Sequence, residues 1–184
     1  YVSRMKEDQK GIYYACGESI DKIDLLPQVE AAKEKGFEIL YCTEYVDEFA
    51  LMTLRSYEEK EFKNVCSENA NLETEEEKKE LEKINEDNKS LLESLKEALK
   101  DKVVDVKVSN RLKSHPVCLT TKGDVSIEMQ KVFDAMPNDM GIKAQTILEI
   151  NEKHPIAEKL KDLYENDKEE FKKYTQILYS EARM

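Results

Sequence analysis

The chain has 184 residues, of which 38% are charged, and its formal net charge at pH 7 is -11. A surface of this sign repels phosphate backbones and anionic membrane faces, so we expect neither nucleic acid nor a membrane as a partner. No apolar run approaches the roughly 20 residues that span a bilayer, and residues 1–10 lack the apolar stretch of a signal peptide. Because the chain begins at Tyr1 rather than at a methionine, we expect a fragment of a longer protein.

Residues 11–42 carry the pattern of a β-α-β unit. The runs 11–16 (GIYYAC) and 37–42 (FEILYC) are rich in strand-forming residues, and the segment between them has helical character. Pro27 suits the first turn of a helix, and Gly36 suits the end of one. We therefore predict two strands connected through helices.

A helix and a short strand are expected next. Thr43 can cap a helix over residues 44–56, and residues 62–66 have the composition of a strand. Helical spacing gives this helix one apolar side, formed by Val46, Phe49, Ala50 and Leu54.

The stretch from residue 68 to residue 87 is acidic and has no strand pattern, so a domain boundary is predicted there. Thr74 and Glu77 form a capping-box pattern at the start of a long helix. Apolar residues recur at helical spacing as far as Leu99. The sequence thus predicts one continuous helix that begins in solvent and ends packed.

Strands and helices then alternate to the end of the chain. The predicted elements are a strand over residues 103–108, a strand over 117–120, a helix over 126–136 capped by Ser126, a strand over 146–150, a helix ending near Asn166 and a helix from Asp167. These patterns predict an α/β (α+β) fold of two small mixed domains, residues 1–69 and 70–184. An acidic, helical connection joins them, and the chain ends in a long amphipathic helix.

The residues that support nucleotide or metal chemistry are missing from this sequence. With only five glycines, neither a Walker loop nor a dinucleotide fingerprint can be written anywhere. His115 and His154 each precede a proline and lack a ligand partner at a recurring spacing. We therefore predict no cofactor, no metal and no catalytic residue in this chain.

The four cysteines, at positions 16, 42, 66 and 118, never form the C-x-x-C spacing of a zinc or redox motif. Three of them lie in apolar, strand-like contexts, where cysteine is usually a small buried hydrophobic residue. Such cysteines in a charge-rich chain without a signal peptide indicate a reducing compartment, so we expect a cytoplasmic protein. A thiol enzyme that uses Cys118 near His115 is an alternative hypothesis.

Long stretches of the sequence resemble the ninety-kilodalton heat-shock family of chaperones, in its bacterial HtpG-type branch. The matching stretches are YVSRMKEDQK at 1–10, IYY at 12–14, GES at 17–19, LP at 26–27, KGFEIL at 35–40, VDEF at 46–49, DKV at 101–103, VSNRL at 108–112, Met129, LEIN at 148–151 and HPI at 154–156. The resemblance covers nearly the whole chain, although residues 68–82 match only in their acidic character.

The resemblance implies a piece of an ATP-dependent chaperone. Residues 1–69 correspond to the carboxy-terminal end of the family's middle domain, and residues 70–184 to its dimerisation domain. In the family, an amino-terminal domain binds ATP and magnesium. This chain is expected to lack that site, so we do not expect it to be an enzyme by itself. Its implied partners are unfolded or partly folded client proteins and, in the parent protein, a second copy. The alternative function is a purely structural assembly module without direct client contact.

Two candidate client-binding surfaces follow from the resemblance. The first lies on the helix after Thr43, where the exposed aromatic of bacterial relatives corresponds to a phenylalanine; its residues are Glu48, Phe49, Leu51 and Met52. The second is an apolar edge of the helix after Ser126, at i, i+3, i+4 and i+7, formed by Val125, Met129, Val132, Phe133 and Met136. Methionine suits such a surface because its side chain repacks around varied partners. For both candidate surfaces the alternative is that these side chains are buried in the domain core.

The last helix carries an apolar stripe that we assign to dimerisation. Its members are Phe171, Tyr174, Ile177, Leu178 and Ala182. Family members dimerise through a four-helix bundle, two helices from each protomer. The chain ends where the second of these helices is expected to begin, so its stripe is expected to be incompletely covered.

Overall fold

The computed structural model describes residues 1–137 and 141–183. Their contacts divide the chain into two compact units. Unit 1 consists of Tyr1–Leu72 and Thr121–Gln145, and unit 2 consists of Glu73–Thr120 and Thr146–Met184. The predicted domains, 1–69 and 70–184, differ from these units in residues 70–72 and 121–145, and they remain a proposal about the folding units.

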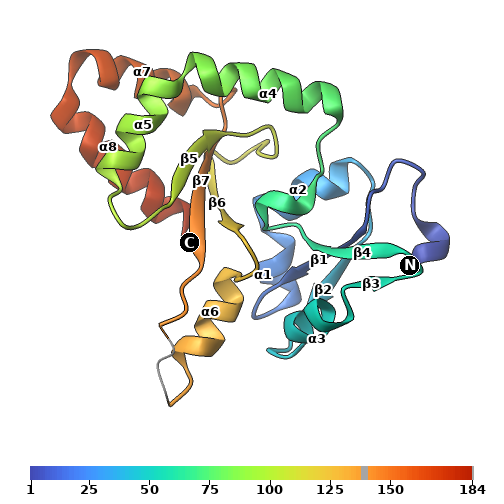
Figure 1. Ribbon diagram of the computed structural model, residues 1–184. Helices are drawn as coiled ribbons and strands as arrows, with labels where there is room; N and C mark the ends of the chain where they lie inside the picture. Colours follow the sequence, from blue (N-terminus) through green and yellow to red (C-terminus); the bar gives the residue numbers. More distant parts are fainter. Residues whose placement is uncertain (138–140, 184) are drawn as a thin grey trace. The chain divides into compact units, whose positions relative to one another are not determined.

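Unit 1 is built on a four-stranded sheet with the strand order β2-β1-β4-β3 (Figure 1). Strand β1 is parallel to both of its neighbours, and β3 and β4 form an antiparallel pair. The elements of this unit are η1 (Val2–Arg4), β1 (Ile12–Cys16), α1 (Ile20–Asp24), α2 (Pro27–Glu34), β2 (Ile39–Cys42), α3 (Asp47–Leu54), β3 (Ser56–Tyr57), β4 (Lys60–Asn64), η2 (Glu68–Ala70) and α6 (Ile127–Asp134). The predicted β-α-β unit is confirmed by the parallel pairing of β1 with β2.

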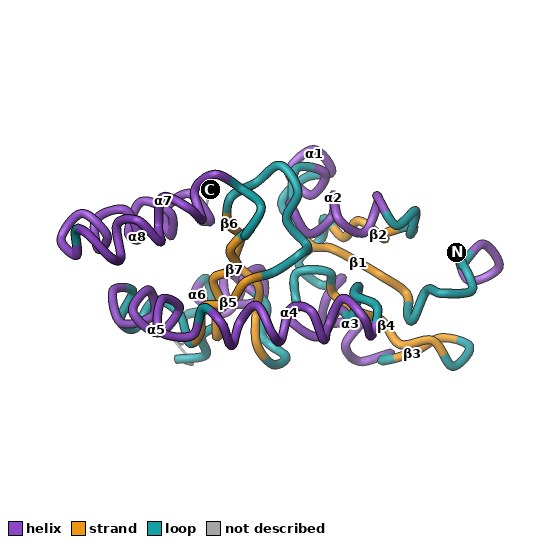
Figure 2. The backbone as a smooth tube through the Cα atoms, turned by 90° about the horizontal axis from the view of Figure 1, so that it is seen from above, coloured by secondary structure: helices purple, strands orange, loops and turns teal. Residues whose placement is uncertain are grey.

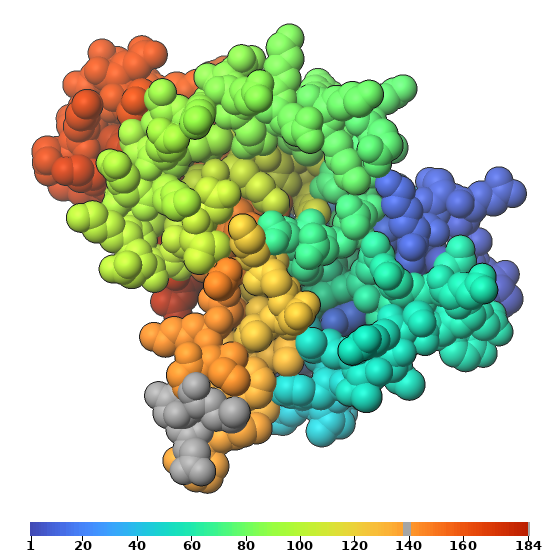
Figure 3. Space-filling model, in the orientation of Figure 1, coloured from blue at the N-terminus to red at the C-terminus, as the bar shows by residue number. Residues whose placement is uncertain are grey.

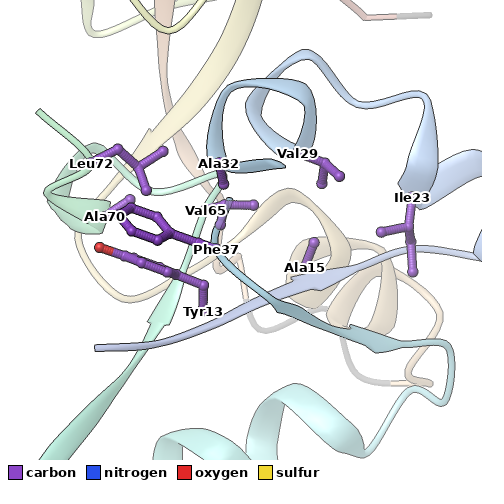
Figure 4. Close-up of a cluster of buried hydrophobic side chains, with 9 residues drawn as sticks. All are labelled: Tyr13, Ala15, Ile23, Val29, Ala32, Phe37, Val65, Ala70 and Leu72. Atoms are coloured by element: carbon purple, nitrogen blue, oxygen red, sulfur yellow. The ribbon is translucent and has the colours of Figure 1, made fainter. Parts of the chain in front are cut away.

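The core of unit 1 lies around the central strand. The rings of Tyr13 and Phe37 stack with centroids 5.4 Å apart, and Val65 and Leu72 are buried in the same cluster (Figure 4). The four residues Ile12 to Ala15 are all buried, although they point alternately to opposite faces. Burial on both faces is typical of a central parallel strand.

The predicted helix boundaries hold at α2 and fail at α3. Pro27 stands in the first turn of α2, and Gly36 follows the helix with a φ of 72° that favours glycine. Thr43 does not cap α3, because residues 44–47 form a turn in which the Asp47 carboxylate accepts a hydrogen bond from the Glu44 backbone N–H (3.1 Å). The helix therefore starts at Asp47, three residues later than predicted.

The predicted apolar side of α3 is also wrong. Val46 and Leu54 are exposed, and Glu48 is the buried residue of the helix. The helix thus turns a carboxylate rather than its apolar residues toward the interior of unit 1.

Unit 2 contains a three-stranded sheet with the strand order β5-β7-β6, in which β5 and β7 are parallel. Its elements are α4 (Glu75–Asp87), α5 (Lys89–Ala98), β5 (Asp105–Val108), β6 (Val117–Lys122), β7 (Gln145–Ile150), α7 (Pro155–Asn166) and α8 (Lys168–Ala182). The mixed strands and helices of the two units confirm the predicted α+β class. No helix among residues 1–137 and 141–183 has both the length and the apolar character needed to cross a bilayer.

The long helix predicted after residue 74 is interrupted. The capping box of Thr74 and Glu77 is present, but α4 ends at Asp87 and α5 begins at Lys89. Between them the Asn88 side chain donates a hydrogen bond to the Ile84 carbonyl (2.8 Å). The backbone of Asn88 departs from helical geometry, with φ -101° and ψ 10°, and this residue both ends α4 and precedes α5.

The helices α7 and α8 lie side by side in both views (Figures 1 and 2). Tyr164 of α7 packs on Phe171 of α8, with ring centroids 5.6 Å apart. Leu160 and Leu178 are fully buried with Leu95 of α5 in the interior of unit 2. The last helix is thus anchored by contacts within its own unit.

A buried ionic cluster lies in unit 2. Glu149 on β7 stands opposite Lys107 on β5, and its carboxylate lies 3.3 Å from the Lys107 ammonium. Thr120 donates a hydrogen bond to Glu149 (2.9 Å), and the Arg111 guanidinium donates one to Glu73 (2.6 Å). Burial opposes ionisation, but the charges of Arg111 and Lys107 hold the pKa of Glu149 below its ordinary value.

Candidate binding pocket between α3 and α6

A pocket of about 120 Å³ lies in unit 1, where the carboxyl ends of β1 and β2 meet α3 and α6. The two strands are parallel, so both end at the same edge of the sheet. The residues that line it are Cys16, Gly17, Glu18, Cys42, Thr43, Glu44, Tyr45, Glu48, Phe49, Glu128, Met129 and Val132. In the space-filling view, the yellow-orange residues of α6 lie against the cyan residues around α3 (Figure 3).

Glu48 is the central polar group of this pocket. One carboxylate oxygen accepts hydrogen bonds from the Asn64 amide (2.7 Å) and the Tyr14 hydroxyl (3.5 Å), and the other accepts one from the Ser126 hydroxyl (2.5 Å). Burial raises the pKa of Glu48, and the charge of Glu128 adds to the rise, while the three hydrogen bonds oppose it. The carboxyl therefore holds a proton more tightly than an exposed glutamate.

Ser126 performs two structural tasks with one hydroxyl group. It accepts a hydrogen bond from the Met129 backbone N–H (3.0 Å) and so caps α6. The same hydroxyl donates its proton to Glu48 on α3. The start of α6 and its attachment to α3 consequently depend on a single side chain.

Apolar side chains surround the polar contact. The ring of Phe49 meets that of Phe133 edge to face, with centroids 5.8 Å apart. Met52 is 36% exposed and Met136 is 42% exposed, and Tyr45 is also exposed. We call Tyr45, Phe49, Met52, Phe133 and Met136 the α3–α6 surface.

Charged residues flank the pocket. Lys131 on α6 forms ion pairs with Glu128 (2.8 Å) and with Glu18 near the end of β1 (3.7 Å). All three side chains are at least partly exposed, so water screens these pairs and they contribute little to stability. The residues that line the pocket include four glutamates and no lysine or arginine, so the rim is acidic.

The two surfaces predicted separately from the sequence form one site. Phe49 and Glu48 of the first contact Phe133 and the cap residue of the second. The exposure differs among the predicted residues: Glu48 and Met129 are buried, Phe49, Leu51, Val125, Val132 and Phe133 are half-buried, and Met52 and Met136 are exposed. Whether they bind clients stays a prediction.

Several residues of the pocket were not predicted from the sequence, among them Cys16, Cys42 and Tyr45. Cys16 and Cys42 were predicted to be separate buried hydrophobic residues, but they line the pocket side by side at the ends of paired strands. Tyr45 also lines the pocket. The signal that could have found the cysteines is their position, since each ends a strand-like run of a predicted parallel pair.

The structure offers little support for the alternative of a thiol enzyme. Cys118 is buried, and the His115 ring lies within hydrogen-bond distance of the Ser114 hydroxyl (3.1 Å). A reactive thiolate needs access and a nearby positive group. Among the described residues, no group of three or more histidine, cysteine or acidic side chains is arranged to hold a metal ion.

The residues assigned to dimerisation divide into two groups. Phe171 and Leu178 are buried within unit 2, whereas Ile177 is 60% exposed, with Tyr174 and Ala182 half-buried. A partner approaching α8 would therefore meet Ile177 first.

A family model described as Hsp90 protein matches residues 1–184. The chain belongs to the Hsp90 family. This membership confirms the resemblance of the motif stretches, from the amino-terminal YVSRMKEDQK to HPI at residues 154–156.

Curated members of the Hsp90 family align with nearly all of the chain. It is 54% identical to the chaperone protein HtpG of Clostridium perfringens, 53% identical to that of Alkaliphilus oremlandii and 50% identical to that of Bacillus subtilis, each over 182 residues. Each alignment covers 99% of this chain but only 29% of the relative. The chain thus spans less than a third of the length of these HtpG-type proteins.

Proposed function

We propose that this chain is the client-binding and assembly part of an ATP-dependent chaperone. ATP and magnesium would be bound elsewhere in the full-length protein, so the activity of this part is binding rather than catalysis. The proposal is supported by family membership and by similarity to proteins named chaperone protein HtpG.

The observation that carries client binding is the grouping of apolar side chains on the α3–α6 surface. Two aromatic rings in contact, Phe49 and Phe133, are flanked by the exposed methionines Met52 and Met136. Unfolded segments present apolar side chains in many arrangements, and the unbranched methionine side chain adapts to them. The acidic rim would favour client segments with positive charge, mainly by speeding encounter.

The test removes apolar area without disturbing the interior. The double change Met52→Ser and Met136→Ser is expected to weaken binding of an unfolded model client about tenfold, a loss of about 1.4 kcal/mol. Binding is measured by fluorescence anisotropy, and suppression of client aggregation by light scattering. Met129 is unsuitable for this test because it is buried, so that its replacement would destabilise unit 1.

A matched control replaces two exposed apolar residues outside the α3–α6 surface. Leu25→Ser with Tyr57→Ser removes two side chains that are more exposed than the methionines, from the end of α1 and from β3, and it is expected to leave binding unchanged. Circular dichroism verifies that both double variants fold. Equal binding by the two variants would favour the alternative, a structural assembly module without direct client contact.

We also propose that α8 contributes to a homodimer of the parent protein. The exposed Ile177 is the residue that a partner would cover. In the parent protein, Ile177→Asp should lower the average mass that light scattering measures over a concentration series. Lys172→Asp, at a charged position of α8, should leave this mass unchanged. Identical masses for the three proteins would contradict this part of the proposal.

A further inference from the structure

The carboxyl ends of β1 and β2 bring two thiols together. Cys16 and Cys42 are register partners in the parallel ladder, in which adjacent strands lie about 4.8 Å apart. Register partners point to the same face of a sheet. Disulfides join Cα atoms separated by roughly 4.4–6.8 Å, so this pair stands within bonding range without a rearrangement of the strands.

Both cysteines line the pocket, so small molecules can reach them. Cys16 is half-buried, and Cys42 is 8% exposed. The ladder continues past the pair, because the Gly17 N–H donates a hydrogen bond to the Cys42 carbonyl (3.1 Å). The two side chains are therefore held in place by backbone pairing on both sides of the site.

The two thiols interact and are not equivalent. The Cys16 thiol donates a hydrogen bond to the Cys42 sulfur, and this bond lowers the pKa of Cys42 in spite of its burial and of the charges of Asp47 and Glu48. The same bond, together with burial, raises the pKa of Cys16. On this direction we assign Cys42 as the attacking sulfur of the pair, although Cys16 is the more exposed of the two.

We propose that Cys16 and Cys42 form a redox-sensitive dithiol, which hydrogen peroxide converts to an intramolecular disulfide in the pocket beside α6. The inference does not rest on the proposed function, since it concerns the chemistry of the pair whether or not the α3–α6 surface binds clients.

The reaction proceeds in two balanced steps. The Cys42 thiolate attacks one peroxide oxygen and the O–O bond breaks; the departing hydroxide takes a proton from solvent to give water, leaving a sulfenic acid on Cys42. The Cys16 sulfur then attacks the Cys42 sulfur and the S–O bond breaks, so that hydroxide leaves with the Cys16 proton as a second water. The two sulfurs lose two electrons, and one peroxide is reduced.

Cys66 is a third cysteine near Cys16 and could form a disulfide with it instead. The backbone of Val65 still bonds to β1, through its N–H and the Tyr14 carbonyl (2.9 Å), which brings Cys66 close enough to contribute to the raised pKa of Cys16. Beyond Asn64, however, the chain leaves the β4 ladder. Only the Cys16 and Cys42 pair combines ladder register with a thiol–thiol hydrogen bond, so it should close first.

The experiment maps disulfides in the wild-type chain. After brief exposure to hydrogen peroxide, the remaining thiols are alkylated and the protein is cleaved with trypsin under non-reducing conditions. The four cysteines fall in separate tryptic peptides, 11–22, 36–55, 64–78 and 114–122. We expect peptide 11–22 linked to 36–55, with the loss of two hydrogens and recovery of both thiols on reduction.

Other outcomes overturn the proposal. A predominant link to peptide 64–78 or 114–122, or alkylation of all four cysteines after peroxide, would show that the pair does not act as a dithiol. In a second measurement, Cys16→Ser should leave a sulfenic acid on Cys42 that dimedone traps, while Cys118→Ser should form the disulfide as the wild type does. Dimedone on Cys66 alone in the Cys16→Ser variant would refute the assignment of Cys42 as nucleophile. The wild-type map remains decisive should a serine variant fail to fold.

Discussion

Two of the three buried glutamates among the described residues, Glu48 and Glu149, respond to burial in opposite ways. Glu48 in unit 1 is 5% exposed, and Glu149 in unit 2 is fully buried. Glu48 accepts its hydrogen bonds from neutral groups and has a raised pKa, whereas Glu149 faces Arg111 and Lys107 and has a lowered pKa. Neutral donors therefore do not offset the cost of removing a carboxylate from water, but two cations do.

The two carboxylates therefore differ in whether their charge is needed for stability. Arg111 and Lys107 lie in unit 2 with Glu149, so loss of either cation leaves a buried carboxylate with less compensation. Glu48 can take up a proton and still hydrogen bond to α6, because a protonated carboxyl both donates and accepts. We expect the stability of unit 2 to depend on the charge of Glu149. The pocket of unit 1 should tolerate neutralisation of Glu48.

The largest effect is expected from breaking the ionic cluster. Arg111→Met keeps an unbranched apolar stem but leaves Glu73 and Glu149 without the guanidinium, and it should lower the free energy of unfolding of unit 2 by about 3–5 kcal/mol. Hydrogen exchange, followed in the peptides of each unit, measures the change.

The control is an arginine whose ion pair is exposed. Arg4 pairs with Glu38, and their side chains are 64% and 49% accessible. Arg4→Met should therefore leave the free energy of unfolding nearly unchanged, because water screens an exposed pair. Equal losses in the two variants would mean that the cluster in unit 2 adds nothing beyond an ordinary surface pair.

The next effect compares the two glutamates directly. At neutral pH, Glu149→Gln should cost about 1.5–3 kcal/mol, because charge-assisted hydrogen bonds are lost. Glu48→Gln should change stability by less than about 1 kcal/mol, because an amide can still donate to Ser126 and accept from Asn64. Urea unfolding of the two variants gives both values.

The pH dependence of these differences has opposite signs. The stability that Glu149 contributes is present above its unfolded pKa of about 4.3 and is lost as the pH falls through its lower folded pKa. For Glu48 the contribution is fully present below about pH 4.3 and is lost as the pH rises through its higher folded pKa. On acidification the wild type should lose stability relative to Glu149→Gln and gain it relative to Glu48→Gln; parallel curves would contradict the comparison.

The smallest expected effect concerns the hydrogen bond that Ser126 donates to Glu48, in addition to capping α6. Ser19 caps α1 through the Lys22 N–H (3.3 Å), as Ser126 caps α6. Ser19→Ala should cost about 1 kcal/mol, the usual value of a cap, and Ser126→Ala about 2 kcal/mol, because Glu48 also loses a donor. Local hydrogen exchange in α1 and α6 tests the difference, and equal costs would show that the bond to Glu48 contributes nothing.

Local signals in the sequence were sufficient for much of the fold. Pro27 and Gly36 marked α2, the Thr74 and Glu77 box marked α4, and Ser126 marked α6, because each residue acts on backbone groups within one turn of itself. The parallel pairing of β1 and β2 followed from the β-α-β pattern. These features required no knowledge of distant residues.

The pocket could not be predicted in the same way, because it depends on contacts between distant segments. The bond between Glu48 and Ser126 joins residues 78 positions apart, and nothing in the sequence around Glu48 distinguishes it from an exposed helical glutamate. The break at Asn88 has a local origin that the sequence also does not reveal, because Asn85 makes the same side-chain bond to the carbonyl four residues earlier and leaves α4 intact.

The division of unit 1 into two sequence segments has a consequence for synthesis. Residues 121–145 complete the unit only after the intervening stretch 73–120 has been made. At roughly 5–20 residues per second, translation from residue 72 to residue 145 takes about 4–15 s. Throughout this delay a nascent chain carries Glu48 and Phe49 without their partners on α6, so this side of the newborn protein is the part that most needs protection from aggregation.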